Sequence, residues 1–189
     1  MSNVSGYIFL VIESLFLAFV LVAMVRLGFS RLESSTGILR DGLSLEKKAP
    51  IWTLPDTTDV LHSVPNGNRW QFLIFTDHSL ASFPELLLGI DHFSNAIQEV
   101  EMLVLARSRK EDCEVIAHEM NLPVPIVPVD QAFYDRYRVR IMPFATLLDP
   151  SGTTRWVGLV NTERQMFLTW EMARVRATYK ELIAAKEVG

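Results

Sequence analysis

The feature that most constrains this chain is a run of apolar residues near its N-terminus. Residues 6–25 read GYIFLVIESLFLAFVLVAMV, and Glu13 is the one charged residue among them. At about 1.5 Å of rise per residue, a helix of this length crosses the roughly 30 Å hydrocarbon core of a bilayer. The sequence therefore predicts a membrane anchor over residues 1–31, with a single transmembrane helix over about 6–25.

A cleaved signal peptide is the alternative for this run. No basic residue precedes residue 6, the apolar run is long, and no Ala-x-Ala-like cleavage site follows it, so we prefer an uncleaved anchor. Glu13 either pairs with a partner helix in the membrane or lies close enough to the interface to be solvated. The basic residues after the run favour a cytoplasmic C-terminal part by the positive-inside rule; they are Arg26, Arg31, Arg40, Lys47 and Lys48.

The composition excludes several kinds of protein. The chain of 189 residues has 18 Lys and Arg against 22 Asp and Glu, which leaves no basic surplus for binding nucleic acid. Its one cysteine, Cys113, excludes an intrachain disulfide, a dithiol redox pair and a zinc site with several cysteines. The histidines are scattered, without the spacing of a metal motif, so we expect neither a metal nor another cofactor.

The remaining residues predict one α/β domain over 49–189, after a polar stretch over 32–48 that is a linker or an arm lying on the domain. Apolar residues spaced three and four apart from Leu80 to Val100 predict the first helix, which begins at Ser79 or Ser82. The order of elements predicts a mixed sheet covered by helices on both faces. We expect strands within 49–56, 60–63, 70–76, 102–106, 124–129, 144–148 and 154–160, and further helices over 111–120, 131–137 and 162–186.

Four features in this order resemble the thioredoxin-like redoxins of the TlpA and peroxiredoxin-like group. They are the segment APIWTLPD at 49–56, the strand that ends at Phe75, the helix start after it, and Met142-Pro143-Phe144 ahead of the turn at 149–152. The resemblance covers about residues 44–180 and implies a thioredoxin-like fold. It also implies that the Met142–Pro143 bond is cis and faces the loop after the central strand.

The stretch after the apolar run resembles the juxtamembrane part of MauD, the methylamine utilisation family. The matching residues are 25–32 (VRLGFSRL), followed by Thr36-Gly37-Ile38-Leu39 and Gly42-Leu43. The resemblance implies a thioredoxin-like domain outside the cytoplasmic membrane and a role in maturing the disulfide-rich subunit of methylamine dehydrogenase. Because long domains cross a membrane despite flanking positive charge, we expect an N-in, C-out anchor and an extracytoplasmic domain.

This sequence departs from the family in the loop after the central strand, where Ser79 and Ser82 replace the two cysteines of Cys-x-x-Cys. A serine hydroxyl is a far weaker acid than a thiol and forms no disulfide, so neither residue could exchange electrons. A serine at the start of a helix would instead cap it by accepting a main-chain hydrogen bond. We therefore expect no catalytic residue, and a binding face made of Asp77, His78, Met142 and Pro143.

Two functions remain open at this point. In the first, the main chain of Met142 beside a cis Pro143 binds an extended peptide of a protein partner by strand addition, without redox chemistry, and the chain is an assembly factor. In the second, the chain is a thiol-disulfide oxidoreductase or peroxidase that acts through Cys113 or a partner. Pro143 could also be purely structural. Acidic neighbours are expected to raise the pKa of Cys113, which favours an incidental thiol over an intermolecular disulfide.

Overall fold

The computed structural model describes residues 41–187 apart from residues 78, 81, 82, 121 and 123, with Met120 and residues 177–187 described by their backbone alone. The order of strands and helices along these residues is the one that the sequence predicts. The elements are β1 (Trp52–Pro55), β2 (Leu61–Val64), β3 (Trp70–Thr76), α3 (Phe83–Ala96), β4 (Val100–Ala106), α4 (Lys110–Met120), β5 (Ile126–Pro128), α5 (Gln131–Arg136), β6 (Phe144–Leu148), β7 (Thr154–Leu159) and α6 (Glu163–Glu187).

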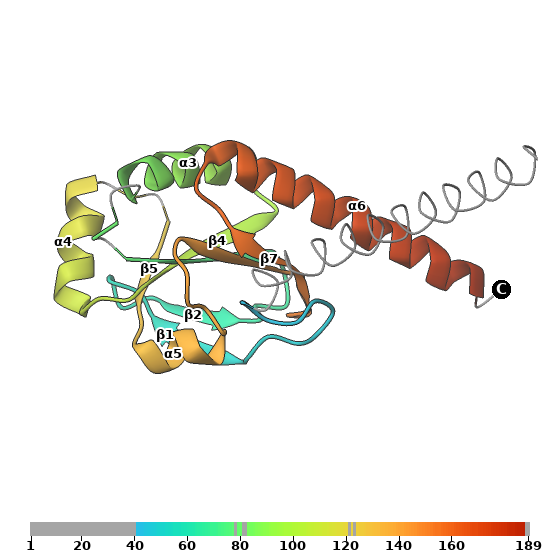
Figure 1. Cartoon of the computed structure of the whole chain (residues 1–189), viewed down its shortest axis with the longest axis horizontal. Coiled ribbons are helices and arrows are strands. Elements are labelled where there is room, and N and C mark those ends of the chain that lie inside the picture. Colours follow the sequence, from blue (N-terminus) through green and yellow to red (C-terminus); the bar gives the residue numbers. More distant parts are fainter. Residues whose placement is uncertain (1–40, 78, 81–82, 121, 123, 188–189) are drawn as a thin grey trace, which may run out of the picture. The chain divides into compact units, whose positions relative to one another are not determined.

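A five-stranded sheet in the order β5-β4-β3-β6-β7 forms the centre of this domain (Figure 1). Strand β3 pairs in parallel with β4, and β4 pairs in parallel with β5. Strand β6 runs antiparallel to both β3 and β7. The sheet is therefore mixed, as predicted, while β1 and β2 form a separate antiparallel hairpin.

The side chains of β3 alternate between two hydrophobic cores. Phe72 and Ile74 belong to one core, together with Trp170 of α6 and residues of α3. Leu73 and Phe75 belong to the other core, with side chains of α5 and the β1–β2 hairpin. Figure 1 shows α3 and α6 on one side of the sheet and α5 with the hairpin on the other. A strand covered on both faces needs apolar side chains at successive positions, which explains the unbroken apolar run.

The first helix of the domain ends earlier than the apolar spacing predicts. Helix α3 ends at Ala96, and Val100 is the first residue of β4, where it pairs with Trp70 of β3. The amide of Ile97 still donates to the carbonyl of Phe93 at 2.9 Å, so one further turn closes before the chain leaves the helix. A spacing of three residues does not distinguish another helical turn from the start of a strand, whereas pairing with β3 does.

Residues 41–48 lie on the domain, as an arm. The amide of Gly42 donates to the carbonyl of Arg138 at 2.9 Å, and the amide of Glu46 donates to the carbonyl of Thr154 at 2.8 Å. The guanidinium of Arg140 donates to the mostly buried carboxylate of Asp41 through Nε at 2.6 Å. The second half of the stretch predicted as a linker or an arm is therefore fastened to the domain.

The predicted anchor over residues 1–31 lies outside the described residues. In the part of the chain that the structure describes, no helix combines the length and the apolar character needed to cross a bilayer. The span over residues 6–25, the orientation of the anchor and the two interpretations of Glu13 stay predictions.

The packing of Gly42 gives the first testable prediction. Its φ is +86°, and a Cβ added there would lie 2.7 Å from Cζ of Phe144. We expect Gly42→Ala to lower the free energy of unfolding by about 2–4 kcal/mol, because a strained backbone and an overpacked core add together. Chemical denaturation followed by tryptophan fluorescence measures this.

Gly67→Ala is the matched control, because Gly67 also has a positive φ, +77°, but its added Cβ meets nothing within 4 Å. It should cost about 1 kcal/mol from backbone strain alone. Equal losses in the two variants would show that the arm does not pack against Phe144 in solution.

Candidate functional site

The loop predicted to hold the site follows β3 directly. Phe75 of β3 pairs with Phe144 of β6, so the antiparallel register brings Pro143 opposite Thr76, at the end of β3. The Met142–Pro143 peptide bond is cis, as the resemblance implied. Asp77, Ser79, Met142 and Pro143 therefore lie at the same edge of the sheet, while His78 and Ser82 are outside the described residues.

Ser79 is held by Asp77 through two hydrogen bonds. The main-chain amide and the hydroxyl of Ser79 both donate to Oδ1 of Asp77, at 3.0 and 2.8 Å. The amide of Phe83, the first residue of α3, donates to the carbonyl of Leu80 at 3.0 Å. Ser79 lies four positions before the helix, so it does not have the capping role that we expected, and its hydroxyl serves to close the loop on Asp77.

Asp77 also contacts Arg107, which the sequence analysis did not identify. Burial of Asp77 acts to raise its pKa, but hydrogen bonds from Ser79 and Arg107 outweigh it, so the pKa is lowered from its ordinary value. One guanidinium nitrogen of Arg107 lies 3.3 Å from Oδ2 of Asp77, and another donates to Oε1 of Gln131 at 2.8 Å. The start of the loop that contains Ser79 thus carries an ion pair.

Arg107 could have been found from the sequence. It follows β4 directly, as Asp77 follows β3, and Thr76 pairs with Ala106 in the parallel ladder. The carboxyl ends of neighbouring parallel strands meet at one edge, so polar residues that follow two such strands lie close together. The prediction required the strand register as well as the residue types.

Tyr134 of α5 fixes this edge of the sheet. Its hydroxyl lies 2.8 Å from the carbonyl oxygens of both Thr76, the last residue of β3, and Leu105, the last residue but one of β4. Its ring lies 5.7 Å from the guanidinium carbon of Arg107. Burial raises the pKa of Tyr134, so the phenol keeps its proton and acts as a hydrogen-bond donor.

The main chain before Pro143 is not used by the fold. Among the residues that the structure describes, neither the N–H nor the C=O of Met142 has a hydrogen-bond partner. Pro143 is buried, Met142 is half-buried, and Ile141 is 44% exposed. One donor and one acceptor are therefore available for an extended chain beside the Asp77–Ser79 loop.

Cys113 lies on α4, the second helix of the domain, as predicted. It belongs to the core beneath α3 and α6 and has no exposed surface. Burial, and to a smaller extent the charges of Asp112 and Glu114, raises the pKa of this thiol to about 11. The direction of the shift agrees with the sequence analysis, but burial rather than acidic neighbours is the main cause.

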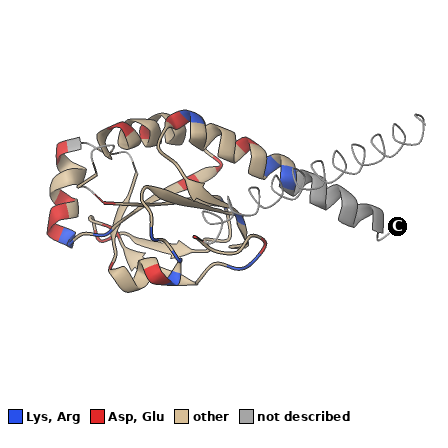
Figure 2. Ribbon diagram, viewed as in Figure 1, with Lys and Arg blue, Asp and Glu red and all other residues tan. Residues whose placement is uncertain are grey.

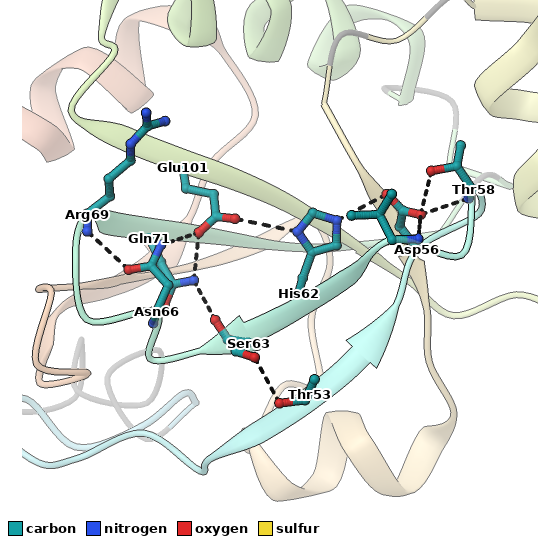
Figure 3. A network of polar contacts seen from close by, with 10 residues as sticks. Thr53, Asp56, Thr58, His62, Ser63, Asn66, Arg69, Gln71 and Glu101 are labelled. Carbon is teal, nitrogen blue, oxygen red and sulfur yellow. Dashed lines mark hydrogen bonds and ion pairs between the residues drawn. The ribbon is translucent and has the colours of Figure 1, made fainter.

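A polar network ties the β1–β2 hairpin to the central sheet (Figure 3). His62 of β2 lies between two carboxylates, with Nε2 3.0 Å from Oδ2 of Asp56 and Nδ1 3.4 Å from Oε1 of Glu101. Gln71 of β3 donates to Oε2 of Glu101 at 2.8 Å and to the carbonyl of Ser63 at 2.9 Å. The sequence analysis treated His62 as isolated, because its partners lie on other elements.

Burial acts to raise the pKa of Asp56, but hydrogen bonds from Thr58, His62 and the amide of Val60 lower it overall. A cleft of about 480 Å³ opens beside this carboxylate and is also lined by Glu114 and His118 of α4. In the described part of the chain, no three His, Cys, Asp or Glu side chains are grouped so that they could hold a metal ion. Through Gln71 and His62, the network joins β2 to β3 and β4.

Comparison with known proteins assigns the fold. No protein-family model and no curated protein matches the sequence. A protein of Chlorobium tepidum assigned as the thiol:disulfide interchange protein DsbE is similar in structure, with a TM-score of 0.63 at 14% identity, covering 69% of this chain and 98% of that chain. Peroxidoxin BcpB of Mycobacterium tuberculosis gives a TM-score of 0.59 at 9% identity, covering 70% of this chain and 97% of that chain.

StoA of Bacillus subtilis gives a TM-score of 0.56 at 17% identity, covering 64% of this chain and 96% of that chain. The described residues therefore form a thioredoxin-like α/β fold, as the sequence predicted. At such identities the likeness shows the fold alone. It does not distinguish the methylamine utilisation group from other thioredoxin-like proteins, so that resemblance stays a prediction.

The burial of Cys113 predicts a slow thiol. At pH 8, a pKa of about 11 in place of 9.0 lowers the thiolate fraction about a hundredfold, and the lack of exposed surface slows alkylation further. We expect iodoacetamide to label the native chain at less than about one hundredth of the rate in denaturant. Mass spectrometry measures the rate, and rapid labelling of the folded chain would contradict the burial.

The Ser79–Asp77 contact predicts a pKa change. Ser79→Ala removes one donor and should move the pKa of Asp77 up, toward 3.8, in a carboxyl-carbon NMR titration. Because the folded pKa is lowered, the stabilisation is present above the ordinary pKa and lost as pH falls through the folded one. The free energy of unfolding of the variant should therefore be lower by about 0.5–1 kcal/mol at pH 7, and by less than that in acid.

The control is Ser94→Ala, because the hydroxyl of Ser94 donates to the carbonyl of Asp91 and to no carboxylate. It should leave the titration of Asp77 unchanged. If Ser79→Ala also leaves it unchanged, the loop is not closed by this hydrogen bond in solution.

Proposed function

We propose that this chain is a membrane-anchored thioredoxin-like protein that lacks redox cysteines and binds an extended segment of a protein partner. The observation that carries the proposal is the main chain of Met142, which has no hydrogen-bond partner among the described residues and lies next to the cis Pro143, beside the Asp77–Ser79 loop. Extended peptides add to exposed main-chain groups by forming strand hydrogen bonds, and these need no particular side chain. Such binding would use the scaffold without electron transfer.

The chemistry of the loop supports a role without redox turnover. Ser79 has an oxygen at the position of the first family cysteine, and Asp77 engages that oxygen. Cys113, the one cysteine of the sequence, has no exposed surface and a raised pKa, so it is a poor thiolate nucleophile. The alternative of an oxidoreductase or peroxidase that works through Cys113 would require α4 to leave the core during each cycle.

A shallow groove beside the loop favours a partner segment that carries negative charge. It has a volume of about 410 Å³ and includes Arg107, Arg109 and Asp130 in its lining. The side chain of Arg107 is 40% exposed and that of Arg109 is 81% exposed. A bound segment with a carboxylate near this groove would gain charge-assisted hydrogen bonds, so we infer a partner segment with acidic residues.

We further propose that the partner is an extracytoplasmic enzyme of the methylamine dehydrogenase type, which this chain helps to assemble in the manner of MauD. The resemblance of residues 25–32 to the juxtamembrane stretch of that family supports this, as does the predicted N-in, C-out anchor. A disulfide-rich subunit exposes extended segments before it folds, and main-chain pairing at Met142 suits such segments because it is tolerant of sequence.

A photo-crosslinking experiment in intact cells tests the proposal. The photoreactive residue p-benzoylphenylalanine takes the place of Ile141, which is 44% exposed and adjacent to Met142. We expect crosslinks to one protein outside the cytoplasm, confined to one contiguous segment that contains acidic residues. Mass spectrometry of the crosslinked peptides identifies that segment.

The same residue in place of Leu88 is the control, because Leu88 is 64% exposed on α3 and lies away from the strand end. It should give no such product. Equal capture at both positions, or no capture at position 141, would refute binding at this face. Capture of a cytoplasmic protein would refute the proposed orientation.

A further inference from the structure

Over the residues whose side chains the structure describes, helix α6 buries one face against the domain. Met166, Trp170 and Ala173 are buried, and the ring of Trp170 lies 5.2 Å from the ring of Trp70. Ala173 is the last buried residue of α6 among those whose side chains the structure describes, whereas the helix continues to Glu187. An isolated helical segment is marginal in water, so exposed apolar side chains on this helix favour a packing partner.

Among the α6 side chains that the structure describes, three large apolar ones lie exposed. Leu168, Met172 and Val175 are 59%, 57% and 64% exposed. At 100° per residue, they form a line on the side of the helix away from Met166 and Trp170. Their spacing of four and three residues is that of the core positions of a heptad repeat, and the printed sequence continues it with Tyr179 and Leu182. Single exposed leucines are ordinary, but a line at this spacing is typical of helix pairing.

We propose that α6 pairs with α6 of a second copy of this chain as a parallel two-stranded coiled coil over residues 168–182. Met172 takes an a position, and Leu168 and Val175 take d positions. Glu171 then falls at g and Arg176 at e. In a parallel pair, a g residue faces the e residue of the next heptad in the other helix, so Glu171 meets Arg176 of the partner subunit.

Charge complementarity favours a second copy of this chain as the partner of α6. It also favours a parallel arrangement of the two helices. The two-fold symmetry of such a dimer makes the Glu171–Arg176 contact twice. In an antiparallel pair, g faces g and e faces e, so Glu171 would not meet Arg176 of the other helix. Figure 2 shows charges of both signs along the described part of α6. In the single chain, Glu171 faces Arg174 at 3.2 Å, and both side chains are about half exposed, so this contact leaves Glu171 able to pair across the dimer.

Site-specific disulfide crosslinking of the full chain in mild detergent tests the proposal. Met172→Cys places a thiol at an a position, where two copies in a parallel, in-register pair bring their side chains together. We expect oxidation with diamide to form a covalent dimer about tenfold faster than in Val115→Cys, because only close Cβ atoms permit the bond. Val115 is the matched control, since it is 56% exposed on α4. The unsubstituted chain, whose one thiol is buried, is the baseline.

A charge exchange between positions 171 and 176 then distinguishes the parallel dimer from other modes of association between two copies. Glu171→Arg in the Met172→Cys chain opposes arginines in both contacts and should slow crosslinking roughly tenfold. Adding Arg176→Glu restores opposite charges in reversed order and should restore the rate. An arginine at position 171 lies next to Arg174 in both variants, so loss of the Glu171–Arg174 contact does not account for a difference between them.

Three outcomes would overturn the proposal. If crosslinking at position 172 is no faster than at position 115, two copies do not contact each other along α6. A double variant as slow as Glu171→Arg would exclude the parallel register. Attachment of the position-172 thiol to another protein, or protection of that thiol by added lipid vesicles, would assign the apolar line to that occupant.

Discussion

The burial of β3 on both faces is the constraint on which the rest of the domain depends. Its four central side chains, Phe72 to Phe75, have no exposed surface, so two separate layers must cover the sheet. Helices α3 and α6 supply one layer, and α5 with the β1–β2 hairpin supplies the other. Because α5 packs there, Tyr134 reaches the carbonyl oxygens of Thr76 and Leu105, near the ends of β3 and β4. The edge that carries the candidate site is thus held by the core beneath it.

At that edge, the loop after β3 keeps its turn without the thiol groups that redox chemistry needs. A thioredoxin-like scaffold needs the chain to turn after β3 and to enter α3, and here Asp77 closes that turn by accepting from the amide and hydroxyl of Ser79. Arg107 then balances the carboxylate from the neighbouring strand end. This arrangement keeps the turn without a thiol, and the main chain of Met142 has no hydrogen-bond partner among the described residues.

The two proposed surfaces lie on different elements, so they do not compete for the same residues. Met142 belongs to the segment before β6, while the apolar line of Leu168, Met172 and Val175 belongs to α6. A dimer through α6 would present two peptide-binding faces on one assembly. Two linked faces bind a partner with two accessible segments more tightly than either face alone, provided that both can be reached at once.

The order of the elements, the two-sided burial of β3 and the absence of a dithiol could be predicted from the sequence, because these depend on residue type and local spacing. The cis bond before Pro143 came from the family resemblance, since spacing carries no information about it. The folded domain was needed to show that Val100 begins β4, that Arg107 faces Asp77, that His62 lies between two carboxylates, and that Cys113 has no exposed surface. Each of these depends on which strands pair and in which register, and pairing brings together residues that local patterns treat as independent.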